Sequence, residues 1–134
     1  SKSGTIRFCV VLRFVMSSGD QFLRSGCPIV NGLDIFGDKW TLVILRDLIC
    51  GKETFTELAD SPEKIPSNRL AERLKMLEAN EMLVKEQYQS RPKRYKYVLT
   101  QKGRDTLPIL QAISIWGNNY VDGTWVPPEW FMKG

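Results

Sequence analysis

The stretch that most constrains the fold is IPSNRLAERLKMLEA, residues 65–79. Leu70, Leu74 and Leu77 recur at the i, i+4, i+7 spacing that lines one face of an α-helix, and the remaining positions are mostly polar. Pro66 suits the first turn of a helix, where a missing backbone N–H costs least. The sequence therefore predicts a short helix over residues 67–79, apolar on one side and polar and cationic on the other.

Positive charge is concentrated around this predicted helix. Residues 64–104 hold eleven Lys and Arg against four Asp and Glu, whereas the rest of the chain holds eight against eleven. Such a surface is typical of proteins that bind polyanions, because neutralising phosphates releases counterions. A solvated charged face without a ligand is the alternative, and charge alone does not separate the two.

The chain of 134 residues, which we take as one domain with tails, lacks histidine. Without histidine, the commonest general base is missing, which argues against most Ser-His and Cys-His hydrolases. Cys9, Cys27 and Cys50 fit neither a disulfide framework nor a clustered zinc site. We therefore expect a cytoplasmic protein that is not an enzyme and uses no cofactor or metal.

Residues 1–26 are expected to be an N-terminal extension. Its apolar run, residues 6–16, is too short and too charged to span a bilayer, so we expect no membrane contact. Met16 is a candidate natural start, which would make residues 1–15 upstream sequence. If they are native, we expect an arm packed on a partner subunit.

Three further helices are predicted on the N-terminal side of the cationic helix. A short helix begins after Cys27-Pro28 and ends at Gly37, and a core helix, apolar nearly all round, covers residues 38–50. Thr54 to Glu57 has the form of a capping box and opens a short helix that ends before Pro62. Cys50, at the end of the core helix, is expected to be buried.

Two β-rich runs, residues 82–89 and 95–100, follow the cationic helix. They flank a connector with three cations, so we expect a β-hairpin with a positively charged tip. A last helix, capped by Thr100, is predicted over residues 101–120 with apolar residues on more than one face, and residues 121–134 are expected to be an extended tail. The surplus apolar face indicates a second subunit.

This order of elements is that of a winged helix. The expected fold is α+β, mainly α: a three-helix core with a β-hairpin wing and a C-terminal dimerisation helix. In such folds the third core helix enters the major groove of DNA and the wing lies along the backbone or minor groove.

Several motifs between Cys27 and Tyr120 carry a family resemblance. They are CPI, GDKWTLVILRDL, FTEL, IPSNRLAERLKMLE, the wing pattern Y-x-x-x-P-K-R-Y-x-Y-x-L-T, its L-T-x-K-G exit and the final Trp-Gly. In order and spacing they resemble the HxlR-type transcriptional regulators, which are close to the MarR-type winged-helix regulators. Lys93 departs from the pattern, because such wings often carry a second proline there. Residues 27–120 are thus the expected DNA-binding domain, and nothing is carried over to residues 1–26 or 121–134.

The resemblance implies a homodimer on a pseudo-palindromic operator of double-stranded DNA, paired chiefly through its terminal helices. It implies no enzymatic activity. It also implies that the cysteine of the CPI motif, Cys27, can respond to oxidants or electrophiles. If Pro28 is the first helical residue, Cys27 lies at the cap, where the helix dipole favours a thiolate. A small, buried, inert thiol is the alternative.

Candidate sites follow from these elements. Asn pairs with adenine and Arg with guanine, so base-edge and nearby phosphate contacts are expected from Ser67, Asn68, Arg69 and Arg73. Phosphate or minor-groove contacts are expected from Arg91, Lys93 and Arg94. Arg73 has the alternative of pairing with Glu72. The expected dimer interface comprises Leu107, Leu110, Ile113, Trp116 and Tyr120.

Two other functions stay open. A winged helix can be a protein-interaction module without DNA binding, although a basic wing argues against it. A regulator that responds to a small molecule is the other, with Trp40, Trp116 and the aromatic tail as candidate pocket residues.

Overall fold

The structure, a computed structural model, describes residues 24–134, so Cys9 and nearly all of the N-terminal extension lie outside the described residues. The chain divides into two compact units, one ending at Thr41 and the other running from Leu42 to Gly134, and each is described by itself. Within the described residues, no helix has the length and apolar character needed to cross a bilayer.

The first unit contains helix α2, Pro28–Phe36, which begins with Pro28 and ends at Gly37 as predicted. Residues 38–40 are not helical, and helix α3, Thr41–Ile49, begins three residues later than expected. The reason is Asp38, whose carboxylate accepts hydrogen bonds from the backbone N–H groups of Trp40 at 2.9 Å and Thr41 at 3.0 Å. Asp38 therefore caps α3 instead of belonging to it.

The core of the second unit is formed by α3, α4 (Phe55–Ala59) and α5 (Ser67–Ala79). The capping box of α4 is present, since Thr54 and Glu57 each bond the other's backbone N–H. Gly51 ends α3 with a φ of 106°, a conformation that suits glycine. The fully buried core side chains of the three helices are Ile44, Leu45, Leu58, Leu70 and Leu77.

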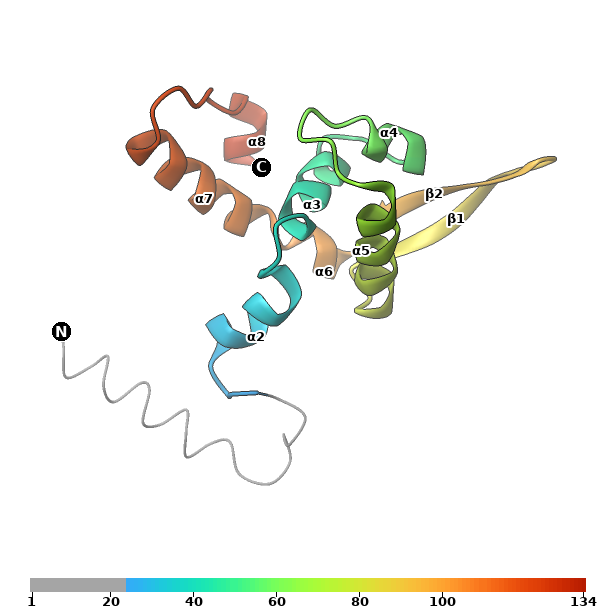
Figure 1. Ribbon diagram of the computed structural model, residues 1–134, viewed down its shortest axis with the longest axis horizontal. Helices are drawn as coiled ribbons and strands as arrows, with labels where there is room; N and C mark the ends of the chain where they lie inside the picture. The colour runs from blue at the N-terminus through green and yellow to red at the C-terminus, as the bar shows by residue number, and fades with distance from the viewer. Residues whose placement is uncertain (1–23) are drawn as a thin grey trace. The chain divides into compact units, whose positions relative to one another are not determined.

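The predicted hairpin is present as antiparallel strands β1, Leu83–Ser90, and β2, Lys93–Leu99. We call this hairpin the wing; it extends away from the helices of its unit (Figure 1). Leu83 pairs with Leu99 at its base, and a bulge between Gln87 and Gln89 interrupts the register near its tip. Strand β1 lies one residue later than predicted and β2 begins two residues earlier, so the connector shrinks to Arg91-Pro92.

The single helix predicted over residues 101–120 is wrong, because two helices occupy this range. Helix α6, Gln101–Arg104, is capped by Thr100, and helix α7, Leu107–Tyr120, follows after a turn. Pro108 explains the break, since proline lacks a backbone N–H and its ring would clash with the carbonyl group of Arg104 in a continuous helix. A Cβ atom at Gly103 would lie 2.1 Å from the carbonyl oxygen of Met82, so α6 approaches the base of the wing closely.

The expectation of an extended tail is only partly met. Residues 121–128 contain no helix or strand, but helix α8, Glu129–Lys133, follows Pro127-Pro128. Phe131 is buried, and its carbonyl oxygen accepts a hydrogen bond of 2.9 Å from the side chain of Gln111 on α7. The tail thus returns along the chain and places α8 beside α7 (Figure 1).

An ion pair connects α3 with the turn that precedes α5. The guanidinium group of Arg46 donates to both carboxylate oxygens of Glu63, at 2.8 and 3.0 Å, and the hydroxyl of Ser61 donates to the same carboxylate at 2.6 Å. These bonds, chiefly those from Arg46, lower the pKa of Glu63 to about 2. The pair fixes the turn from which α5 starts.

This pair predicts a loss of stability in acid. The folded-state pKa of Glu63 is about 2 against an ordinary value of 4.5, so its contribution is complete above pH 4.5 and lost as the pH falls toward 2. Because the Glu63 side chain is 34% exposed, Glu63→Gln should lower the free energy of unfolding at pH 7 by only about 1–2 kcal/mol. Urea titrations at pH 7 and pH 3 measure this difference, which should shrink at pH 3. Glu86→Gln, on the exposed wing, is the control; an equal loss at both pH values would contradict the assignment.

Candidate nucleic-acid interface

Helix α5 buries one side and exposes the other. Leu70, Leu74 and Leu77 are buried, as their spacing predicts. Because successive helical residues are about 100° apart, the side opposite these leucines carries Asn68, Glu72 and Lys75, all of which are exposed. We call these three residues the outer row of α5. A binding partner that docked on the exposed side of α5 would contact the outer row first.

Two of the sequence-predicted contact residues flank this row and are held by it. Arg69 donates to one carboxylate oxygen of Glu72 at 3.1 Å, and Arg73 donates to the other at 2.7 Å. The alternative of an Arg73–Glu72 pair is therefore confirmed. The hydrogen bond from Arg73, followed by the positive charge of Arg69, lowers the pKa of Glu72, so this carboxylate remains ionised at neutral pH.

The N-terminal end of α5 is polar and exposed. Pro66 is the N-cap residue, and it provides no side-chain cap for the backbone N–H groups of the first turn. Ser67 and Asn68 are exposed, and the side-chain oxygen of Asn68 accepts only a local bond of 2.9 Å from the N–H of Arg69. Free N–H groups and the helix dipole both favour an anion such as a phosphate here.

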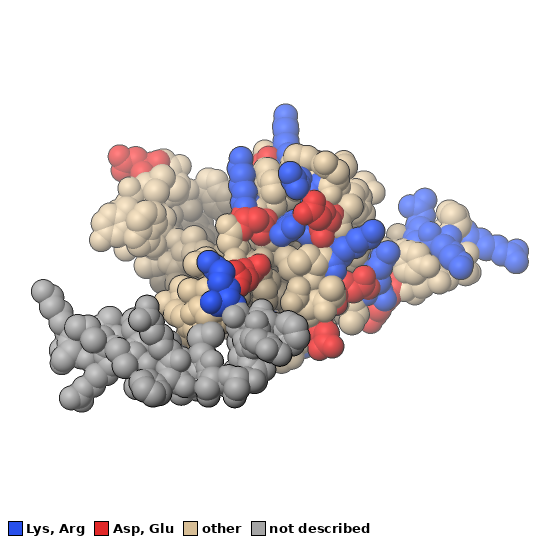
Figure 2. Space-filling model, turned by 60° about the horizontal axis from the view of Figure 1, so that its bottom comes forward, with Lys and Arg blue, Asp and Glu red and all other residues tan. Residues whose placement is uncertain are grey.

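The tip of the wing holds Arg91, Lys93 and Arg94, and all three are exposed. Figure 2 shows Lys and Arg side chains gathered at this far end of the molecule. Among the described residues none of the three has an ion-pair partner, in contrast to Arg69 and Arg73. Farther down the wing, Lys96 pairs with Glu53 at 3.7 Å, and the backbone N–H of Tyr97 donates to the carbonyl oxygen of Glu53 at 2.7 Å. These contacts support the base of the wing and leave its tip cations available.

Cys27 is the N-cap residue of α2, with Pro28 as the first helical residue, which is the position expected for it. It is partly buried and not disulfide-bonded. Its carbonyl oxygen accepts bonds from the backbone and side-chain N–H groups of Asn31 at 3.0 and 2.8 Å. Cys27 thus lies at the N-terminal, positive end of the α2 dipole.

Cys50 was expected to be buried, and this is wrong. It follows the last residue of α3 and is exposed, because the chain turns at Gly51 directly after it. Partial desolvation and then the Asp47 carboxylate raise the pKa of the Cys50 thiol. Since the thiolate is the reactive form, these surroundings make the Cys50 thiol less reactive than an ordinary exposed thiol.

Helix α7 separates the five residues expected at the dimer interface into two groups. Leu110 is buried within the chain and Leu107 is partly buried. Ile113, Trp116 and Tyr120 are 51%, 61% and 73% exposed, and the rings of Trp116 and Tyr120 lie 5.4 Å apart. Ile109, which is also exposed, precedes them and completes an i, i+4, i+7, i+11 spacing along the helix. We call these four exposed residues the outer stripe of α7.

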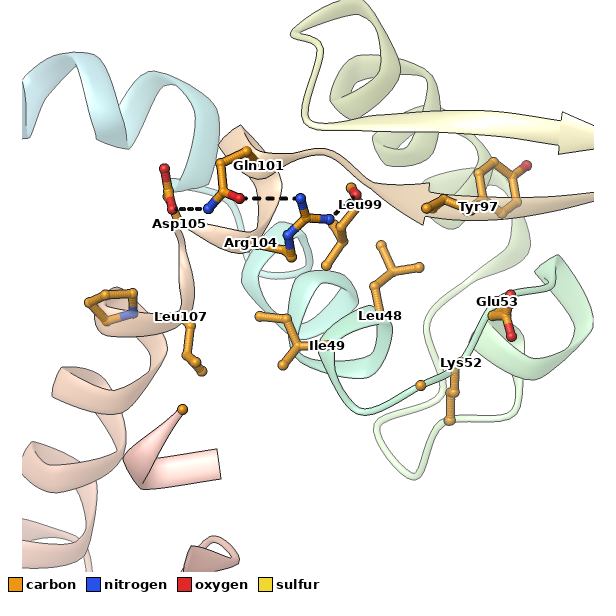
Figure 3. Close-up of a pocket in the computed structure, with 14 residues that line it drawn as sticks. Leu48, Ile49, Lys52, Glu53, Tyr97, Leu99, Gln101, Arg104, Asp105 and Leu107 are labelled. Carbon is orange, nitrogen blue, oxygen red and sulfur yellow. Dashed lines mark hydrogen bonds between the residues drawn. The ribbon is translucent and has the colours of Figure 1, made fainter. Parts of the chain in front are cut away.

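A hollow of about 620 Å³ lies between the end of α3, the base of β2, α6 and the start of α7. Tyr97 is its one aromatic lining residue (Figure 3), and its aliphatic lining residues are Leu48, Ile49, Val98, Leu99, Leu107 and Pro108. Trp40 and Trp116, named as candidate pocket residues, are not among its lining. Arg104 at its rim donates to the carbonyl oxygen of Leu99 at 2.7 Å and to Gln101 at 3.2 Å, so its charge is already engaged.

The sequence and fold match known regulators. The family model described as HxlR-like helix-turn-helix matches residues 35–124. YdeP, an uncharacterized HTH-type transcriptional regulator of Bacillus subtilis, is 36% identical over 105 residues, which are 78% of this chain and 80% of YdeP.

Solved structures agree with this match. The redox regulator HypR in its oxidized form superposes with a TM-score of 0.65 at 32% identity, over 72% of this chain and 99% of HypR. The quinone-bound transcriptional regulator YodB of B. subtilis gives a TM-score of 0.59 at 28% identity, over 70% of this chain and 99% of YodB. With an α5 that exposes a polar row and a cationic wing on one unit, the chain belongs to the HxlR-like helix-turn-helix family of transcriptional regulators.

Proposed function

We propose that this protein is a sequence-specific DNA-binding regulator that acts in the cytoplasm as a homodimer on a pseudo-palindromic operator. Helix α5 enters the major groove, with Ser67, Asn68 and Arg69 near base edges and Arg73 near the backbone. The tip of the wing lies against phosphates or in the minor groove. The observation that carries this proposal is the exposed polar row of α5 in the same unit as three unpaired cations at the wing tip.

The outer stripe of α7 supports the dimer. Exposed aromatic and β-branched side chains at helical spacing are typical of a face that a second copy covers. A two-fold symmetric pair places two copies of α5 on one side of the duplex, which explains why operators of such dimers are palindromic.

Selection of bound duplexes from a randomised DNA library tests this proposal. Sequencing of the selected fragments should reveal two inverted half-sites about one helical turn apart. Random enrichment, with no motif at any salt concentration, would exclude sequence-specific binding and favour the protein-interaction module.

The trigger that we propose is oxidation or alkylation of Cys27. Its place at the start of α2 supports this, together with the similarity to a redox regulator and to a regulator with a quinone-bound form. The hollow beside α6 offers a non-covalent small molecule a place to bind, but Cys27 does not line it.

Cys27→Ser should therefore remove the response to oxidant. In the parent protein, diamide or benzoquinone should change operator affinity by about fivefold or more, as is usual for coupled sites. Cys50→Ser is the matched control and should respond like the parent, because the pKa of the Cys50 thiol is raised. Fluorescence anisotropy on labelled operator, before and after treatment, measures the change. A Cys27→Ser protein that still responds would remove Cys27 from the mechanism.

A further inference from the structure

The residue at the centre of the exposed side of α5 is an acid. Glu72 lies between Asn68 and Lys75 in the outer row, and its side chain is 50% exposed. A helix inserted into a major groove presents this side to the base edges. The carboxylate of Glu72 would then face the bases between the amide of Asn68 and the ammonium group of Lys75. Phosphates repel it, and a negative charge there weakens binding to DNA in general.

The carboxylate is also fixed in position. Arg69, three positions before Glu72, and Arg73, the next residue, each hold one of its oxygens. Each carboxylate oxygen can accept a further hydrogen bond while these pairs persist. The three side chains therefore form one surface in which an acceptor lies beside two donors.

Only some bases present a hydrogen-bond donor to a carboxylate in the major groove. In the major groove guanine presents only acceptors and thymine presents an acceptor and a methyl group, whereas cytosine N4 and adenine N6 carry donor amino groups. A C·G pair places the cytosine amino group beside the two guanine acceptors, which suit a bidentate arginine. A Glu–Arg pair can thus contact both bases of one C·G pair without breaking its own ion pair.

We infer that Glu72 is a specificity-determining residue that accepts a hydrogen bond from a base amino group in the major groove, cytosine N4 foremost. This inference rests on the proposed function, because it assigns a base contact to the helix that the proposal inserts. Arg69 then binds the guanine of the same pair. Where no amino group is present, the carboxylate opposes binding.

The experiment compares the parent with Glu72→Ala and Glu72→Gln in duplex selection and in salt titrations on the selected operator and on scrambled DNA. Glu78→Gln is the matched control, since it removes the same charge from an exposed position of α5 away from the outer row. Circular dichroism and sedimentation of the four full-length proteins confirm that fold and assembly are equal.

We expect the parent to select one base pair per half-site that depends on Glu72, with about 10- to 100-fold preference over the other pairs. Glu72→Ala should lose this preference and bind scrambled DNA more tightly, with a salt slope steeper by up to about one unit because Arg69 loses its carboxylate partner and becomes available for a phosphate. Glu72→Gln should shift the preference to adenine, which Gln pairs bidentately. Glu78→Gln should select the same sequence as the parent.

The outcomes are distinguishable. A selected C·G pair that disappears in Glu72→Ala supports cytosine N4 as the donor, and an A·T pair that disappears supports adenine N6. A Glu72→Ala protein with the parent's preference at every position overturns this inference and leaves the proposed function intact. A parent protein that selects no sequence overturns the proposed function, and this inference with it.

Discussion

Trp116→Ala is expected to dissociate the dimer at micromolar concentration and with it to abolish tight operator binding. Trp116 is 61% exposed in the single chain and stacks against Tyr120 at the centre of the outer stripe. Truncating a central interface tryptophan typically costs about 2–4 kcal/mol, which raises the dissociation constant of a dimer about 30- to 1,000-fold. A monomer reads one half-site only, so operator affinity falls further through lost effective concentration. Sedimentation velocity and anisotropy on the full operator measure the two effects.

Ile115→Ser is the matched control for this prediction. Ile115 is 54% exposed on the same helix but lies outside the outer stripe, so its replacement should leave the sedimentation coefficient and the operator affinity unchanged. Equal effects of the two substitutions would show that α7 pairs through another face. A parent chain that sediments as a stable monomer at micromolar concentration would remove the dimer altogether.

The second large effect is expected from the division of labour between α5 and the wing. Asn68→Ala or Arg69→Ala should lose one base contact, weaken operator binding by about 1–3 kcal/mol and relax the preference at one operator position. Lys93→Ala or Arg94→Ala removes an unpaired cation from the wing tip, so binding to operator and to scrambled DNA should weaken alike. The slope of log affinity against log salt should fall by roughly one unit per lost phosphate contact.

Salt titrations of all four variants on operator and scrambled DNA measure both effects. Lys102→Ala is a suitable control, because Lys102 is exposed on α6 and donates to the carbonyl oxygen of Asn80 at 2.7 Å. If Lys93→Ala and Arg94→Ala change the operator preference while the salt slope stays the same, the division of labour is wrong.

The winged-helix core was predictable because its elements are defined by local signals. The bounds of α5 follow from Pro66 and the leucine spacing, and α4 follows from its capping box, so tertiary contacts had little to change. The β-hairpin could also be predicted from the sequence, since its strands contain tyrosine and valine residues that favour β-structure.

The wrong predictions concern features that the hydrophobic periodicity of the sequence does not indicate. The apolar pattern of residues 101–120 continues through Pro108, but the backbone cannot, and the helix divides. Helix α8 is too short to show a period, and its stability depends on the burial of Phe131 against distant residues. Both errors lie where tertiary packing or a single proline outweighs the sequence pattern.

The candidate site was predictable as a set of residues but not as an arrangement. Residue types and spacing indicated Arg69, Arg73 and the alternative Arg73–Glu72 pair, while the pairing of the same carboxylate with Arg69 emerges only from side-chain geometry. In the same way, Leu110 and Ile113 looked equivalent in sequence, and only burial separates the inner from the outer side of α7.

On the proposed function, the cations of the wing tip and the arginines of α5 should act at different stages of DNA binding. Arg91, Lys93 and Arg94 stand unpaired at the end of a projecting hairpin, where long-range attraction to phosphates accelerates encounter and depends strongly on ionic strength. Arg69 and Arg73 must first adjust their bonds to Glu72, so they act after encounter and determine how long the complex lasts. On the proposed function, we therefore expect wing-tip substitutions to change the association rate and α5 substitutions to change the residence time on each sequence that the protein samples.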